Sequence, residues 1–350
     1  MRSMFKKFCV DTTKDGKMLY ILKMAMAVLG SFLVINVLCF FYFDLPRAVT
    51  NRDDFTTRKN IPNHKVCYCG EGFGISQTDK YGFYNDGNVT FDNANIVCIG
   101  SSQTEAIQVN EEEKYVSLLN GMDEHNHAYN LGVSGQYFEK YCGRLPIIPR
   151  FFPSAGLIIM ETIHMPKEDD WDAIMDTLST GNLAIEDHDW KEQNLLFRIC
   201  RSIPYTALLK RQITGIMEAL NDKKDAVPEK TNGMLQYTIK ANNTMELLRQ
   251  KMGNMPLIFL YVPYMDMDHK GQVSVAEDKA KIAAVEKACK SNSIIFVNMG
   301  PAFLEYYNKN HVLPHGHLNS QVGKGHLNKD GHRMIADTLA KRIHQEGLVP

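Results

Sequence analysis

The sequence predicts a three-layer α/β domain with a mostly parallel sheet, preceded by one transmembrane helix. Three observations lead to this prediction. From residue 93 onward, short apolar runs alternate with amphipathic helical segments; residues 24–43 carry no charge; and 44% of the 350 residues are hydrophobic. Strands that alternate with helices along a chain are typical of a parallel sheet with helices on both faces.

The composition excludes several classes of protein. With 23% charged residues alongside its apolar content, the chain is typical of a globular protein rather than a disordered or fibrous one. The formal net charge of −1 argues against a nucleic-acid partner, which usually requires a clear basic excess. We find no glycine-rich loop of the Walker or dinucleotide type, so we expect no cofactor.

Residues 24–43, MAMAVLGSFLVINVLCFFYF, are predicted to form the transmembrane anchor. At about 1.5 Å per residue, this run spans roughly 30 Å, which matches the hydrocarbon core of a bilayer. The preceding basic residues are Arg2, Lys6, Lys7, Lys14, Lys17 and Lys23. They favour a cytoplasmic tail over residues 1–23 and place the rest of the chain outside the cytoplasm. A cleaved signal peptide is the competing interpretation, but no small-x-small site follows the run. A buried core helix rarely lacks a polar face over such a length.

The segment of residues 44–92 is polar and irregular, and we interpret it as a linker with a surface segment. Cys67, Cys69, Cys98, Cys142, Cys200 and Cys289 fall outside the predicted anchor and tail. These six could form disulfides, and the sequence does not select the pairs. Cys98 lies within an apolar strand pattern, so we expect a buried free thiol there.

The domain of residues 93–350 is assigned element by element from its periodicity. We expect strands within residues 94–100, 127–136, 154–161, 256–264 and 293–300, and helices within residues 111–122, 276–292 and 326–345. Residues 165–250 interrupt this alternation with helical patterns at 171–180, 205–221 and 242–253. We interpret this middle part as a helical insertion, which could serve as a lid.

The stretch VCIGSSQTEA, residues 97–106, raises two interpretations of Ser102. Ser102 and Glu105 fit a capping box, in which the hydroxyl and the carboxylate close the first turn of a helix. This interpretation is favoured by the stretch alone. The other is a nucleophile presented where a strand turns into a helix, near the positive end of the helix dipole.

Other stretches supply what a serine nucleophile needs. An oxyanion site requires backbone N–H donors, and NLGVSGQ places Gly135 in a glycine-rich strand end. A general base is also required, and GHLNKDGHRMIADTL places His326 in the turn before the last helix. Gly325 permits a close approach to that histidine.

The order IGSSQTEA, NLGVSGQ, PLIFLYVP, GHLNKDGHRMIA resembles the SGNH, or GDSL-type, hydrolase superfamily over roughly residues 93–345. The resemblance implies a flavodoxin-like α/β fold and cleavage or transfer of acyl groups. It implies that Ser102 is the nucleophile, that Gly135 donates to the oxyanion together with the Ser102 N–H, and that His326 is the base. Ser101 stands where the family usually has Asp, a substitution associated with membrane-linked branches.

Two positions depart from the family pattern. His164 stands where the family has an Asn that donates to the oxyanion; it could donate in its place or be only a histidine at a strand end. The Asp that normally lies three residues before the base is Gly323, so the third triad member is left open. Candidates for that member are Glu161, Asp266, Asp268 and Asp330, and some family members work as a dyad.

Four histidines near the C-terminus raise two further questions: whether they bind a metal, and which of them is the base. His315, His317, His326 and His332 match no zinc spacing, so we expect no metal site. His317 also begins an HLN sequence and is the rival base, but only His326 is followed by a Gly-His pair and a helix.

The sequence therefore predicts a membrane-anchored, extracytoplasmic serine esterase or O-acyltransferase. The resemblance suggests an acylated carbohydrate or another ester as substrate, an acetyl ester of a cell-surface polysaccharide above all, and a multi-pass acyltransferase as a partner. The alternative is a catalytically weak module that binds glycan or a partner in an envelope acylation system. A structural protein in which Ser102 only caps a helix is the third interpretation.

Overall fold

The computed structural model describes residues 14–42, 48–49, 59–60, 62–180, 213, 217, 233–268, 271–275, 278–320, 323 and 325–349. The chain divides into two compact units, residues 1–44 with 188–223, and residues 45–187 with 224–350. In the first unit, helix α1 spans Lys14–Tyr42, so it begins well before the predicted span. Its stretch Gly16–Leu38 is long and apolar enough to cross a membrane by length and composition.

The second unit is built on a five-stranded parallel sheet. Its strands are β5 (Ile96–Ile99), β6 (Ala128–Asn130), β7 (Leu157–Thr162), β8 (Leu257–Tyr261) and β11 (Ile295–Asn298). They lie in the order β11-β8-β7-β5-β6, and every neighbouring pair is parallel. Numbered along the chain, this is the flavodoxin-like order 2-1-3-4-5. All five predicted strands, and the predicted fold, are confirmed.

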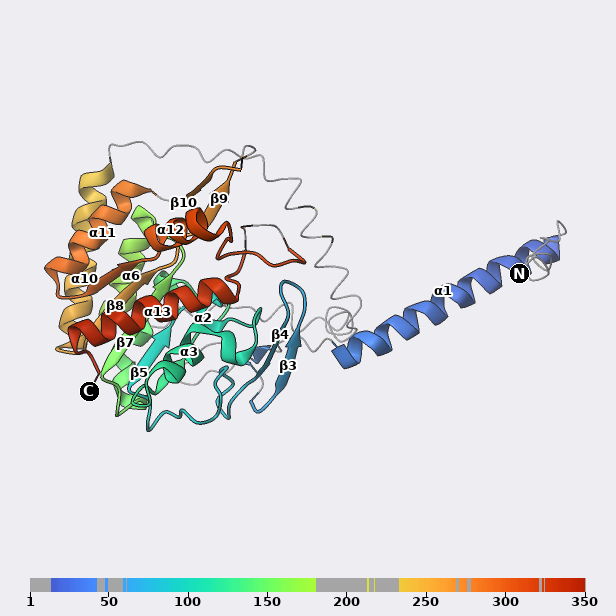
Figure 1. Ribbon diagram of the computed structural model, residues 1–350, viewed down its shortest axis with the longest axis horizontal. Coiled ribbons are helices and arrows are strands. Elements are labelled where there is room, and N and C mark those ends of the chain that lie inside the picture. Colours follow the sequence, from blue (N-terminus) through green and yellow to red (C-terminus); the bar gives the residue numbers. More distant parts are fainter. Residues whose placement is uncertain are drawn as a thin grey trace. The chain divides into compact units, whose positions relative to one another are not determined.

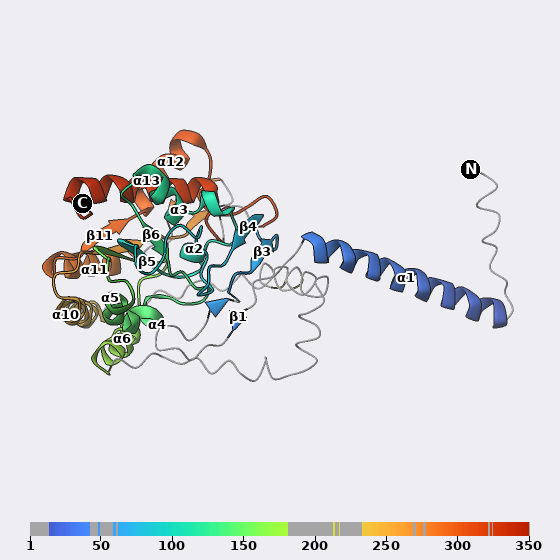
Figure 2. The same ribbon diagram turned by 90° about the horizontal axis from the view of Figure 1, so that it is seen from below.

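Helices cover both faces of the sheet, with α3, α12 and α13 on one side and α4, α5, α6, α10 and α11 on the other (Figure 2). Along β5, Val97 and Ile99 face one hydrophobic core, whereas Ile96 and Cys98 face the other. Successive side chains of a strand point to opposite faces, so a strand covered on both sides is apolar throughout. This explains why the predicted strands are uninterrupted apolar runs.

The second unit also contains helices between and after its strands. They are α2 (Ser102–Glu105), η2 (Glu111–Glu113), α3 (Tyr115–Met122), α4 (Phe138–Tyr141), η3 (Cys142–Ile147), α5 (Ile148–Phe151), α6 (Glu168–Thr180), α10 (Met234–Met252), α11 (Lys279–Ser291), α12 (Gly300–Asn310) and α13 (Lys329–Glu346) (Figure 1). The sequence did not predict α12, which begins with Gly-Pro and buries only Gly300 and Phe303.

Within the described part of the chain, three antiparallel strand pairs lie outside the main sheet. They are β1 (Ala48–Val49) with β2 (Lys59–Asn60), β3 (Lys65–Tyr68) with β4 (Gly74–Gln77), and β9 (Met265–Met267) with β10 (Val273–Val275). The β3–β4 hairpin lies in the segment interpreted as linker and surface. Val66 and Tyr68 of this hairpin pack with Tyr84 and Ile107 in a small core of their own.

The interpretation of residues 165–250 as a helical insertion that could serve as a lid needs a correction for helices α6 and α10. Trp171 and Ile174 of α6 and Met245 and Leu248 of α10 are buried in the same core as Phe259 of the sheet. These two helices therefore form part of a layer of the domain rather than a lid. The helix predicted for residues 205–221 lies outside the described residues, apart from positions 213 and 217. Cys98, Cys142 and Cys289 are buried free thiols, as predicted for Cys98.

His315 is a buried histidine whose titration should make the fold sensitive to acid. Burial, helped by the nearby charge of His326, lowers the pKa of His315 from 6.5 to about 3, and neither ring nitrogen has a hydrogen-bond partner among the described residues. Below pH 6.5 the unfolded chain therefore binds a proton that the folded chain does not. We expect this histidine alone to reduce the free energy of unfolding by up to about 1.4 kcal/mol per pH unit from about pH 6.5 towards pH 3. Urea unfolding of His315→Asn at several pH values should show a slope smaller by that amount. An unchanged slope in His315→Asn would contradict the prediction.

Candidate active site

The serine of interest lies at the carboxyl end of β5, where the chain turns into α2. Ser101 is the N-cap of this helix: its hydroxyl accepts a hydrogen bond from the Gln103 N–H at 3.3 Å. Glu105 does not close a capping box, because its carboxylate binds Asn60 and Ser134 instead. The capping-box interpretation of Ser102 is therefore wrong. Ser102 is the first helical residue, half-buried, and its hydroxyl is available for other contacts.

That hydroxyl contacts the predicted base. The distance from Ser102 Oγ to His326 Nε2 is 2.9 Å, and His326 Nδ1 lies 2.6 Å from Glu71 Oε2. The other carboxylate oxygen, Oε1, accepts the backbone N–H of His326 at 2.8 Å. A carboxylate on Nδ1 favours the tautomer with its proton there, so Nε2 is left to accept the proton of Ser102. The chain thus contains a Ser–His–Glu arrangement.

Glu71 was not among the predicted third members. It comes from the turn between β3 and β4, and its side chain is 14% exposed. Burial alone would raise the pKa of its carboxyl, but the hydrogen bond and charge of His326 outweigh this effect, so the pKa lies below its usual value. Glu71 is therefore ionised at neutral pH and can stabilise a protonated His326.

A glycine permits this contact. Gly325 has φ of +85°, and a Cβ atom on it would lie 2.0 Å from Glu71 Oε1. Any side chain at this position would collide with the carboxylate and would also be strained by the backbone. The close approach expected at Gly325 is seen in the structure, although the group that approaches was not foreseen.

The four predicted third members lie elsewhere. Asp266 and Asp268 belong to the β9–β10 hairpin and Asp330 to the first turn of α13, and the carboxylate on His326 Nδ1 is that of Glu71. Glu161 is fully buried at the end of β7 and accepts hydrogen bonds from the Ser101 N–H, the Ser101 hydroxyl and the Thr104 hydroxyl, at 2.8–3.1 Å. Burial raises the pKa of Glu161, and these hydrogen bonds offset only part of the rise. Glu161 therefore holds the turn beneath Ser102.

Two further side chains, those of Gln103 and Asn319, hold the base and its carboxylate in place. Gln103 of α2 accepts the Leu327 N–H at 2.8 Å and donates to the Gly325 carbonyl at 3.4 Å, which ties the helix of the nucleophile to the loop of the base. Asn319 accepts the Gly72 N–H at 2.7 Å and donates to the carbonyls of Gly72 and Cys69. The turn that carries Glu71 is thereby held on the loop that leads to His326.

The predicted oxyanion residues follow β6 and β7. Gly135 lies in an exposed turn with φ of +79°, and neither its N–H nor that of Ser102 has an acceptor among the described residues. His164 follows β7, with its ring 6.0 Å from that of Tyr137 and 5.6 Å from that of Tyr264 between centroids. Although His164 is exposed as a whole, partial desolvation of its ring and the charge of Lys167 lower its pKa. The ring is therefore neutral at pH 7 and carries one N–H that can donate.

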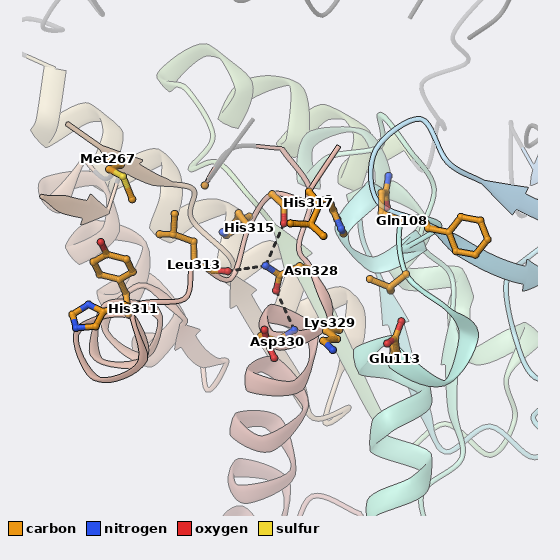
Figure 3. A pocket seen from close by; sticks show the side chains of 16 residues that line it. Gln108, Glu113, Met267, His311, Leu313, His315, His317, Asn328, Lys329 and Asp330 are labelled. Atoms are coloured by element: carbon orange, nitrogen blue, oxygen red, sulfur yellow. Dashed lines mark hydrogen bonds between the residues drawn. The ribbon is translucent and has the colours of Figure 1, made fainter. Parts of the chain in front are cut away.

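His315, His317 and His332 lie in the described part of the chain. The described residues contain no group of three or more His, Cys, Asp or Glu side chains arranged to hold a metal ion. His317, the rival base, lies against Gly72 rather than Ser102. A pocket of about 560 Å³ is lined by His315, His317, Phe73 and Asp330 among others (Figure 3). Ser102 and His326 do not line it, so it borders the turn of Glu71 rather than the serine hydroxyl.

The comparisons with known proteins give only distant likenesses. No family model matches the chain, and no curated protein matches it. Among solved structures, a putative GDSL-like lipase from Parabacteroides merdae is 13% identical over 75% of this chain and 98% of that one, with a TM-score of 0.38. An acetyl xylan esterase is 12% identical over 71% and 99%, with a TM-score of 0.36.

The salicylyl-acyltransferase of a tetracycline biosynthetic pathway is 10% identical to this chain, with a TM-score of 0.37. The match covers 73% of this chain and 56% of that protein. At such identities and TM-scores, the activity of a neighbour does not transfer to this chain. The strand order 2-1-3-4-5, seen in this chain itself, confirms the flavodoxin-like fold that the sequence resemblance implies.

Proposed function

We propose that the chain is a membrane-anchored serine esterase or O-acyltransferase that works outside the cytoplasm. The observation that carries the proposal is the 2.9 Å contact between Ser102 Oγ and His326 Nε2, with Glu71 on the opposite ring nitrogen. A hydroxyl, an imidazole and a carboxylate in this order form the arrangement that activates serine for attack on an acyl carbonyl.

The reaction begins when Ser102 Oγ attacks the ester carbonyl and its proton passes to His326 Nε2. The negative charge that develops on the carbonyl oxygen is stabilised by the N–H groups of Ser102 and Gly135, with His164 as a third donor. When the tetrahedral intermediate collapses, His326 gives its proton to the departing alcohol and an acyl-serine ester remains. Water or an acceptor hydroxyl then attacks this ester while His326 takes its proton, and Ser102 is regenerated.

The substrate we propose is an acyl ester of a carbohydrate, with acetyl esters of cell-surface polysaccharides as the leading class. The support is the resemblance of the sequence motifs to anchored SGNH proteins, and the same resemblance suggests a multi-pass acyltransferase as donor of the acyl group. The apolar stretch Gly16–Leu38 supports membrane attachment. The basic residues before it favour a cytoplasmic N-terminus and an extracytoplasmic domain.

A catalytically weak binding module is less well supported than an enzyme. One reason to consider it was the absence of an acidic residue three positions before His326, but Glu71 supplies a carboxylate to the same ring nitrogen. The other was the absence of the usual Asn, for which His164 offers a neutral N–H donor. The half-buried Ser102 within hydrogen-bond reach of His326 also argues against a purely structural serine.

Covalent labelling tests the proposed nucleophile directly. We expect a fluorophosphonate to add one phosphonyl group to the full-length protein in detergent micelles, and peptide mass spectrometry to place the group on Ser102. The same protein unfolded in urea serves as the control and should remain unlabelled, because an isolated serine hydroxyl is a weak nucleophile. The absence of an adduct, or an adduct on another serine, would contradict the proposal.

A further inference from the structure

The turn that carries Gly135 is held from both sides by buried charged residues. Gly135 itself is exposed and makes no hydrogen bond through its N–H within the described part of the chain. Its neighbour Ser134 binds Glu105, and its neighbour Gln136 binds Arg144. Together with the backbone hydrogen bonds of Val133 and Gln136, these two contacts restrain the turn and the direction of the Gly135 N–H.

Glu105 makes the first contact. This side chain is 4% exposed; it accepts the Ser134 N–H at 3.1 Å and also the Ser134 hydroxyl. Glu105 belongs to the same four-residue helix as Ser102. The contact therefore ties the Gly135 turn to α2, the helix that begins with Ser102.

Gly132 allows the loop to come this close. A Cβ atom at this position would lie 2.1 Å from the backbone nitrogen of Glu105. The loop after β6 thus packs directly against the backbone of α2, with no side chain between them. The two N–H groups of Ser102 and Gly135 consequently belong to one packed unit.

Arg144 makes the second contact. Its guanidinium Nη2 donates to Gln136 Oε1 at 3.0 Å, and the two residues are 3% and 4% exposed. The Gln136 N–H also donates to the Val133 carbonyl at 3.0 Å, which closes the turn around Ser134 and Gly135. A glycine with positive φ at the third position of such a turn fits a type II turn.

We propose that Glu105 and Arg144 are positioning residues that hold the Gly135 N–H ready to donate to the oxyanion. The inference rests on the proposed function and deepens it, because it explains how an exposed glycine turn keeps the geometry that stabilisation of a transition state requires. Donors that are fixed before the reaction stabilise developing charge without the cost of reorganisation. Neither residue touches the substrate; both act through the turn.

The test compares an aryl acetate with its thiono analogue, in which sulfur replaces the carbonyl oxygen. Sulfur accepts hydrogen bonds more weakly than oxygen, so the thionoester depends less on the oxyanion donors. In Glu105→Gln, assayed as the full-length protein in detergent, we expect kcat for the oxygen ester to fall about 10²-fold with KM within about twofold. For the thionoester, we expect kcat to fall by no more than about threefold. A merely structural defect would slow both substrates equally.

Two milder variants keep the inference testable if Glu105→Gln does not fold. Ser134→Ala removes the hydroxyl donor to Glu105, and Gln136→Met removes the acceptor for Arg144. We expect each to lower kcat for the oxygen ester about 10-fold and to leave the thionoester nearly unchanged. The exposed Glu112→Gln is the matched control and should behave as wild type.

The outcomes separate this inference from the proposed function. Equal losses on both esters in folded variants, or no loss on either, would overturn the positioning role while leaving the enzyme intact. Hydrolysis that survives Ser102→Ala, or a wild type with neither hydrolysis nor labelling by a fluorophosphonate, would instead overturn the proposed function and the inference with it.

Discussion

Replacing Ser102 with alanine is expected to lower the release of acetate from an aryl acetate by at least about 10⁴-fold. The variant lacks the oxygen that attacks the carbonyl, so no acyl-enzyme can form, and His326 has no hydroxyl to deprotonate. Because Ser101 rather than Ser102 caps α2, the helix keeps its cap and the fold should be retained. Initial rates on the full-length protein in detergent, together with a thermal melt of each variant, measure both effects.

The matched control for this substitution is Ser179→Ala. Ser179 is exposed on α6, and its hydroxyl donates only to the backbone within its own helix. Its loss should leave the rate unchanged. If Ser102→Ala hydrolyses the ester as fast as Ser179→Ala, Ser102 is not the nucleophile, and a binding module becomes the better interpretation.

Replacing Glu71 with glutamine should lower kcat by about 10³ to 10⁴-fold with little change in KM. The amide keeps the shape of the carboxyl group but loses its charge. Its NH₂ group can donate to Nδ1, which favours the imidazole tautomer with the proton on Nε2, and that tautomer cannot accept the Ser102 proton. The protonated histidine that forms during attack also loses its counter-charge. Steady-state kinetics of the variant give kcat and KM separately.

Glu112→Gln is the control here as well, because Glu112 is an exposed glutamate outside the Ser102–His326–Glu71 contacts. We expect Asp330→Asn and Asp266→Asn to retain activity, since neither carboxylate is the one bound to the base. Full activity in Glu71→Gln, combined with a large loss in one of these two variants, would restore the assignment predicted from the sequence and contradict the one drawn from the structure.

The sheet could be predicted because each of its strands carries its own signal. The runs that became β5, β7 and β8 are apolar on both faces, as strands covered by helices must be. Helix α12 follows β11 directly and begins with Gly-Pro, so the sequence was interpreted there as the end of a strand and not as the start of a helix. The insertion was misjudged because α6 and α10 contribute to the core through contacts that arise only in the folded domain.

Within the candidate site, the residues that follow strands of the sheet could be located from the sequence, and Ser102 is the example. Glu71 could not be located, because it meets His326 across 255 positions of sequence and comes from a polar hairpin with no periodic signal. One local feature does mark it: glycines stand on both sides of it in CGEGFG. A carboxylate between glycines indicates a place where backbone and side chain approach another segment closely.

The hairpin that supplies Glu71 lies ahead of β5 and contributes no strand to the main sheet. A shortened chain that begins at residue 93 would contain all five parallel strands, but it would lose Tyr81, Phe83, Val89 and Phe91 from one hydrophobic core. Such a chain would lack the carboxylate that orients the base. The main sheet and the complete Ser–His–Glu arrangement therefore require different lengths of chain, and a chain that retains every strand of the sheet can still be inert.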